Sequence, residues 1–102
     1  MTPAKLVFTY KAEDDLNSIF RFLAENHPSN AVDYIDGMRA AIENLIIFPC
    51  MGVECKTKGI DRDCRILILD KYLIFYQFDE DDNEIKILRI LHGSRKYHEL
   101  LK

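Results

Sequence analysis

The sequence lacks any apolar run long enough to cross a bilayer, and it also lacks an export signal. A transmembrane helix needs roughly 20 consecutive apolar residues, and every hydrophobic stretch here is much shorter. The amino terminus, Met-Thr-Pro-Ala-Lys, has no basic segment followed by an apolar one. These absences predict a cytoplasmic protein that has no membrane partner.

Cysteine and histidine are too few and too scattered to suggest a metal centre. The three cysteines, Cys50, Cys55 and Cys64, are odd in number and have no paired C-x-x-C spacing. The sequence therefore predicts ordinary reduced thiols. The histidines lie at no metal-ligand spacing either; they are His27, His92 and His98.

Common catalytic motifs are absent as well. The glycines Gly52 and Gly59 are too isolated to form a phosphate-binding loop, and no serine lies in a nucleophile-elbow context. The acidic run from Asp79 to Glu84 is typical of a solvated turn. The sequence therefore predicts neither a cofactor nor a metal.

What is present fits one folded domain over residues 1–102. Hydrophobic residues make up 48% of the chain and charged residues 30%, which is the balance of a globular protein. There is no internal repeat, low-complexity tract or Gly/Ser linker. One hydrophobic core is therefore expected.

Hydrophobic periodicity predicts the order β-α-α-β-β-β. The expected elements are a strand over Leu6–Tyr10, a helix from Ala12 to Asn26, a second helix from Ser29 or Asn30 to Pro49, strands over Arg65–Leu69, Tyr72–Phe78 and Glu84–Leu91, and a short helix or arm over Ser94–Lys102. Short connections predict an antiparallel helical hairpin and an antiparallel meander. The fold class is α+β, with the hairpin on one face of a small sheet.

Charge is unevenly distributed along the chain. Residues 84–102 carry five basic and two acidic side chains, whereas residues 1–51 carry four basic and seven acidic ones. The net charge of −3 argues against strong general attraction to nucleic acid. The basic carboxyl-terminal end therefore holds the candidate functional residues.

Two residues of this end have alternative interpretations. Strand alternation places Arg89 on the same face as Ile85, Ile87 and Leu91, where its guanidinium needs either a carboxylate of the chain or an anionic ligand. His92 either packs at the strand end or acts as a general base. Gly93 is expected to supply a backbone angle that other residues resist.

The next segment combines charge with an aromatic ring. Arg95 and Lys96 precede Tyr97, and basic residues beside aromatics hold RNA through phosphate contacts and stacking. The same group can equally anchor a protein interface.

Several segments together resemble the ParE branch of the ParE/RelE toxin superfamily of bacterial type II toxin–antitoxin pairs. They are FPCMG after the second helix, YLIFYQF in the middle strand, and IKILRILHGSRKYHELL at the end. Ala12, Asp15 and Leu16 also fit that family's A-x-x-D-L helix opening. The resemblance implies the same β-α-α-β-β-β fold and a cognate antitoxin that wraps over the toxin.

The two branches act differently, and the resemblance favours ParE. ParE members bind DNA gyrase and trap it on broken DNA, whereas RelE members cut messenger RNA in the ribosome. Leu73 stands where the RNA-cutting members carry an arginine, and leucine cannot donate to a phosphate. Leu91 to Arg95 fits the L-H-G-x-R ending of ParE-like members. Asp63-Cys64-Arg65 stands where that branch often has Gly-Leu-Arg, so only the arginine is kept, and Lys96 replaces the usual acidic residue.

The resemblance therefore implies a gyrase inhibitor with no catalytic residue of its own. Its expected target-binding residues are Arg65, Arg89, His92, Arg95 and Tyr97. Its expected antitoxin-binding residues are Phe20, Leu23 and Phe75. The alternatives are a ribosome-dependent messenger-RNA endonuclease that uses the same five residues, and a non-toxic relic that still binds antitoxin.

Overall fold

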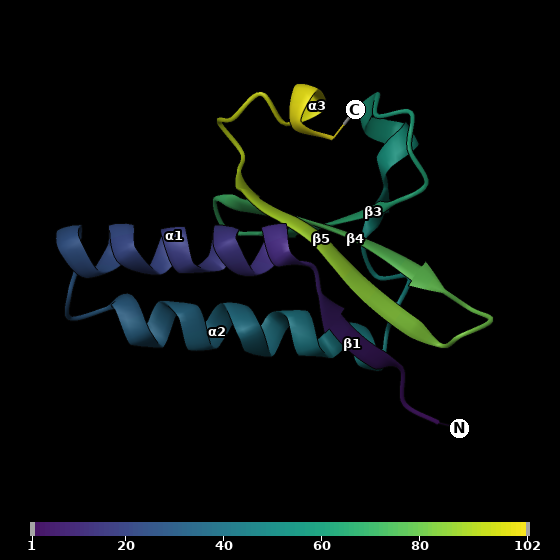
Figure 1. Cartoon of the computed structure of the whole chain (residues 1–102), viewed down its shortest axis with the longest axis horizontal. Helices are drawn as coiled ribbons and strands as arrows, with labels where there is room; N and C mark the ends of the chain where they lie inside the picture. Colours follow the sequence, from purple (N-terminus) through teal and green to yellow (C-terminus); the bar gives the residue numbers. More distant parts are fainter. Residues whose placement is uncertain (1, 102) are drawn as a thin grey trace.

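The computed structural model describes residues 2–101, apart from the side chain of His98, and its ribbon is drawn in Figure 1. The elements in chain order are β1 (Lys5–Phe8), α1 (Tyr10–Asn26), α2 (Ala31–Glu43), the 3₁₀ helix η1 (Asn44–Ile46), β2 (Val53–Glu54), the 3₁₀ helix η2 (Cys55–Lys58), β3 (Arg65–Leu69), β4 (Tyr72–Asp79), β5 (Glu84–His92) and α3 (Tyr97–Leu100). The predicted α+β class is confirmed. No helix among residues 2–101 is both long and apolar enough for a membrane span.

The five strands form one mixed sheet in the order β1-β5-β4-β3-β2. The predicted meander β3-β4-β5 is antiparallel, with turns at Asp70-Lys71 and after Asp79. β1 adds to β5 in parallel, and the short β2 adds to β3 in antiparallel fashion. The pattern gave no sign of β2, because two exposed residues have no readable periodicity.

The first strand is shorter than its alternating pattern predicted. β1 ends at Phe8, and Tyr10 already begins α1 with 84% of its surface exposed. The cause is Thr9, whose hydroxyl accepts a hydrogen bond from the Ala12 amide and caps the helix. The same hydroxyl donates to the Leu88 carbonyl, which fixes the start of α1 against β5.

The helical hairpin covers one face of the sheet and builds the larger core. The buried stripes of α1 and α2 meet alternate residues of β4 and the inward residues of β5. Members of this cluster include Leu16, Ile19, Ile35, Met38, Ile42, Ile74, Tyr76, Ile85, Ile87 and Ile90. The predicted hairpin on one face is confirmed.

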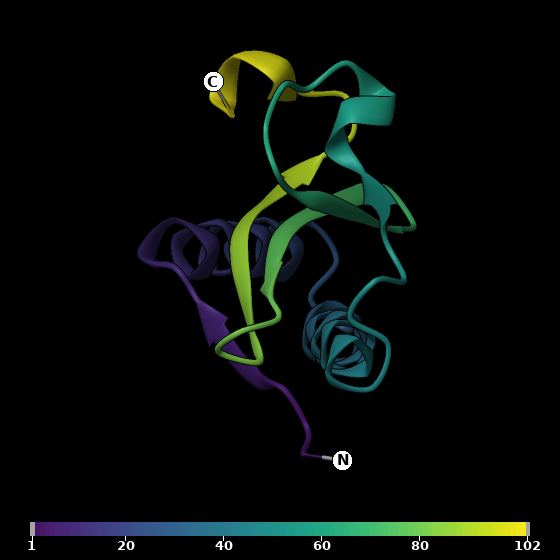
Figure 2. The same ribbon diagram turned by 90° about the vertical axis from the view of Figure 1, so that its right-hand side faces the viewer.

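The opposite face is covered by the loop after β2 and by the carboxyl-terminal segment. Figures 1 and 2 show these two segments together, away from α1 and α2. Their cluster consists of Cys55, Ile60, Cys64, Ile66, Phe75, Leu88, Leu91 and Leu101, with Leu73 and Tyr97 packed against it. The sheet is therefore buried on both faces.

The prediction of reduced thiols is wrong for two of the three cysteines. Cys55 and Cys64 form a disulfide, with their Cα atoms 5.3 Å apart, whereas Cys50 is a free, exposed thiol. The chain reverses between β2 and β3, so the Cys55 amide donates to the Cys64 carbonyl across 2.9 Å. Spacing along the sequence does not reveal this reversal.

A bulge in β5 changes which residues share a face. Phe75 pairs with Arg89 while Tyr76 pairs with Ile87, so Leu88 is an additional residue. The expectation that Arg89 shares a face with Ile85 and Ile87 is therefore wrong, because the alternation restarts after Leu88.

The expectation for Gly93 is also wrong. Gly59 is the only glycine with positive φ among the described residues. A Cβ at Gly93 would meet only the Lys71 carbonyl oxygen, at an ordinary 3.5 Å.

The turn between β3 and β4 predicts a response to alkaline pH. The Tyr34 hydroxyl donates to Asp70 across 2.9 Å, and burial together with this hydrogen bond raises the pKa of Tyr34 to about 12. Because unfolded tyrosine ionises near pH 10, the stabilisation is complete below pH 10 and is lost as pH rises to 12. Replacing Tyr34 with phenylalanine should flatten this loss in denaturation curves, and an unchanged slope would contradict the assignment.

Candidate functional site

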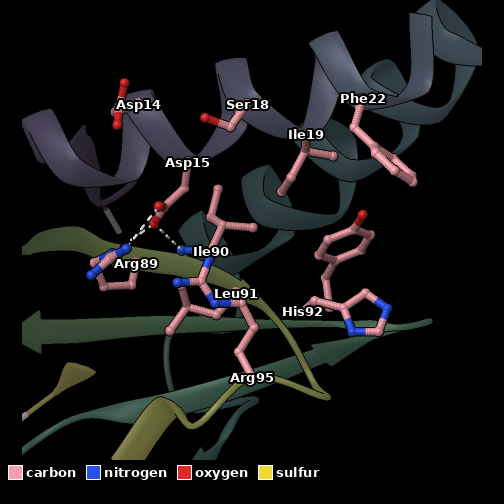
Figure 3. A pocket seen from close by; sticks show the side chains of 11 residues that line it. Asp14, Asp15, Ser18, Ile19, Phe22, Arg89, Ile90, Leu91, His92 and Arg95 are labelled. Carbon is pink, nitrogen blue, oxygen red and sulfur yellow. Dashed lines mark hydrogen bonds and ion pairs between the residues drawn. The ribbon is translucent and has the colours of Figure 1, made fainter. Parts of the chain in front are cut away.

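A hollow lies between α1 and the end of β5, and Figure 3 shows it. Its volume is about 470 Å³. It is lined by Asp14, Asp15, Ser18, Ile19, Phe22, Tyr72, Arg89, Ile90, Leu91, His92 and Arg95. We call this hollow the α1–β5 pocket.

The pocket exists because α1 leaves the sheet where β1 ends. β1 pairs with β5 only as far as Phe8 and Ile87, so the rest of that edge of β5 has no strand beside it. The Asp15 carboxylate takes this place and accepts a hydrogen bond from the Ile90 amide at 2.9 Å. A side chain of α1 thus satisfies an edge group of β5.

Asp15 also binds Arg89 through both of its oxygens. The Nε and Nη2 atoms of Arg89 donate to Oδ2 and Oδ1 of Asp15, across 2.8 and 2.9 Å (Figure 3). The two side chains are only 16% and 12% exposed. The hydrogen bonds to Asp15 raise the pKa of Arg89, although burial opposes this effect. Of the two interpretations of Arg89, the structure supports the first, in which the guanidinium pairs with a carboxylate of the chain.

His92 stands at the other end of the pocket. Its Nδ1 accepts a hydrogen bond from the Ser94 amide at 3.1 Å and lies 2.7 Å from the Ser94 hydroxyl. Its ring packs edge-on against Tyr72, with the centroids 5.4 Å apart. Because Nδ1 is an acceptor for an amide, the proton of the neutral ring lies on Nε2.

Arg95 contributes a positive charge to the lining of the pocket. Arg95 is exposed, and its guanidinium has no hydrogen bond or ion pair with any residue that the structure describes. Asp14, also exposed, lines the same hollow from α1. The pocket thus holds two carboxylates and two guanidinium groups, so its formal charge is balanced.

Two of the five predicted target-binding residues lie outside this pocket. Arg65 bonds to the Cys50 and Gly52 carbonyl oxygens at 3.3 and 2.8 Å, and it pairs with Glu54 at 3.5 Å. Tyr97 packs on Phe75 on the face opposite the helices, with ring centroids 5.7 Å apart. The structure therefore brings Arg89, His92 and Arg95 together but not Arg65 and Tyr97.

The three predicted antitoxin-binding residues also differ in accessibility. Phe20 on α1 is 39% exposed, and Leu23 is partly buried against the helix-side core. Phe75 is fully buried beneath the carboxyl-terminal segment. A partner would reach Phe75 only after that segment moved.

Residue patterns did not predict the α1 wall of the pocket. Asp14, Ser18 and Phe22 recur at intervals of four residues, which puts them on one face of a helix. This spacing of polar and aromatic residues was the only pattern in the sequence that could have predicted the wall.

Within residues 2–101, apart from His98, no three His, Cys, Asp or Glu side chains are grouped to hold a metal ion.

Comparison with known proteins identifies the family. The family model described as the ParE toxin of the type II toxin–antitoxin system parDE matches residues 6–97. No curated protein sequence matches the chain significantly.

Two solved structures share the fold. The chromosomal ParDE toxin–antitoxin system from P. aeruginosa is matched with a TM-score of 0.65 and 22% identity, over 87% of this chain and 95% of that one. The toxin–antitoxin complex RelBE2 from Mycobacterium tuberculosis is matched with a TM-score of 0.61 and 20% identity, over 89% and 99%. At these low identities the structural matches show only the shared fold. The match to the family model identifies the ParE branch. The chain belongs to the ParE toxin family of type II toxin–antitoxin systems.

Proposed function

We propose that this ParE-family toxin acts in the cytoplasm by binding DNA gyrase and cutting nothing itself, and that a cognate antitoxin holds it inactive. The observation that carries the proposal is the Arg89–Asp15 pair in the α1–β5 pocket. A catalyst of RNA cleavage must stabilise developing negative charge on a phosphate with free donors. Two of the donors of Arg89 are already bonded to the Asp15 carboxylate.

The surroundings of the pocket support binding over cleavage in two further ways. The carboxylates of Asp14 and Asp15 offset the two guanidinium groups, so the pocket has no net positive charge to attract a phosphodiester. Leu73 in β4 offers an apolar side chain where an RNA-cutting member needs a guanidinium. The endonuclease alternative, with ribosome and messenger RNA as partners, also requires Arg65 and Tyr97, which lie elsewhere.

Within this proposal the residues have different tasks. Arg95 and His92 form the rim that would touch gyrase, because both are accessible beside an apolar wall. Arg89 is a positioning residue that fixes β5 against α1. Arg65 and Tyr97 remain predicted target contacts outside the pocket.

The proposal is tested by the supercoiling activity of purified gyrase. The wild-type chain should block supercoiling in modest molar excess, and Arg95→Glu should need about ten-fold more protein because a rim charge is reversed. Lys86→Glu is the matched control, since Lys86 is likewise an exposed basic residue but lies within β5 and does not line the pocket. No inhibition by excess wild-type chain would remove gyrase as the target. A normal antitoxin complex with harmless expression would instead favour the relic.

A further inference from the structure

A second groove lies between α2 and β3, apart from the α1–β5 pocket. It has a volume of about 350 Å³ and is lined by Asp33, Tyr34, Gly37, Met38, Leu69 and Asp70. Met38 and Leu69 belong to the helix-side core or pack against it, so the floor is apolar. We call this hollow the α2–β3 groove.

Gly37 lies in the middle of α2, and packing within the chain gives no reason for it. A Cβ at this position would meet nothing within 4 Å, and its φ is not positive. Glycine inside a helix lowers the folding equilibrium about four-fold relative to alanine. A residue that destabilises the free chain and leaves a gap on a groove wall fits the close approach of another backbone.

The edge of β3 beside this groove is open. β2 pairs with β3 only at Arg65 and Ile66. The pair Leu69 and Tyr72 flanks a two-residue turn, so the amide and carbonyl of Ile68 point away from β4 toward that edge. The Ile68 side chain is 55% exposed. An extended segment can therefore bond to β3 there.

The rim of the groove is acidic. Asp33 and Asp70 line it from α2 and from the β3–β4 turn, and no lysine or arginine among residues 2–101 lines it. One oxygen of Asp70 already accepts the Tyr34 hydroxyl. The remaining carboxylate oxygens complement a basic side chain.

We propose that the α2–β3 groove receives an extended segment of the antitoxin. The segment places an apolar side chain over Met38 and Leu69, a lysine or arginine between Asp33 and Asp70, and its backbone against Gly37. This inference rests on the proposed function, since it names how the antitoxin of that proposal engages the chain.

The test uses Gly37→Ala, whose two expected effects have opposite signs. Urea denaturation of the free chain should show a folding equilibrium about four-fold more favourable. Calorimetric titration with a purified ParD-type antitoxin from the same organism should show a dissociation constant at least about ten-fold higher, because the methyl group holds the partner away. Ala40→Gly is the control. It exchanges the same residues on an exposed part of α2 outside the groove, so it should lower stability and leave affinity unchanged.

The acidic rim has a matched pair of its own. Asp33→Asn should weaken antitoxin binding several-fold and reduce its dependence on salt. Asp36→Asn removes an equal charge from α2 outside the groove and should change neither.

The outcomes separate this inference from the proposed function. If wild-type chain binds the antitoxin and Gly37→Ala binds it equally well, the groove assignment is wrong while the toxin–antitoxin pairing stands. If the wild-type chain does not bind, the inference and the antitoxin part of the proposed function both fall, whereas the supercoiling assay still decides the gyrase part. Sedimentation that shows a wild-type dimer abolished by Gly37→Ala would make a second copy of the chain the occupant, which also overturns the inference.

Discussion

Replacing Asp15 with alanine should lower the free energy of unfolding by about 3 kcal/mol, the lower end of the range for breaking a buried ion pair from one side, because this pair is partly buried. Arg89 would keep its charge at a site where only 16% of its side chain is exposed. The Ile90 amide would lose its acceptor at the same time. Urea denaturation followed by circular dichroism measures the change.

Two variants make this result specific. Asp14→Ala removes the neighbouring carboxylate, which is exposed and bonds to no described group, so it should change stability by less than about 0.5 kcal/mol. Asp15→Leu combined with Arg89→Met replaces the pair by apolar side chains and should recover most of the loss. A loss below about 1 kcal/mol for Asp15→Ala would show that the pair does not hold α1 on β5.

Replacing Gly52 with alanine should cost about 3 kcal/mol, at the upper end of the range for overpacking. A Cβ there would lie 2.7 Å from the Ile66 carbonyl oxygen and 2.9 Å from a ring carbon of Tyr76. The Ile66 backbone, held in β3, cannot move away from the added methyl group as the end of a flexible side chain could. The Gly52 amide also donates to the buried Tyr76 hydroxyl, which in turn donates to the Pro49 carbonyl. A shift at Gly52 therefore breaks a hydrogen-bonded chain.

Gly93→Ala is the matched control for this effect. Its Cβ would meet only one atom, at an ordinary contact distance, so stability should change by less than about 0.5 kcal/mol. Equal melting temperatures for the two alanine variants would show that the loop before β2 is not anchored as described.

Residue patterns predicted the meander well because each strand has a strong signal of its own. β4 alternates between the two cores from Tyr72 to Tyr76, and the Asp70-Lys71 turn fixes its register with β3. The second helix begins close to its predicted cap at Asn30. These features depend on residues near one another in the sequence.

The features that were missed depend on particular hydrogen bonds, chain reversals and strand pairings, which hydrophobic periodicity does not encode. The Thr9 cap competes with the strand pattern that continues through Tyr10, and hydrogen bonding decides the outcome. The disulfide requires the reversal between β2 and β3. The bulge at Leu88 is read only from the register with Phe75 and Tyr76. None of these is encoded in a local period.

The same division applies to the α1–β5 pocket. The run from Arg89 to Arg95 was predictable as a candidate site, because charged residues end an apolar strand. Asp15, the partner of Arg89, is 74 residues away and has the pattern of an ordinary residue in the first turn of a helix. The need of a half-buried guanidinium for a carboxylate was predictable, but the identity of that carboxylate required the packing of α1 on β5.

The proposed function is that this chain binds DNA gyrase and cleaves no macromolecule itself. Its most direct test is induction of the chain alone in a bacterium, with DNA breaks bearing covalently attached gyrase and new transcript ends inside coding regions both mapped in the same cells. The account predicts gyrase-linked breaks with intact messages. Messages cut at ribosome-bound codons, without gyrase on DNA ends, would contradict it.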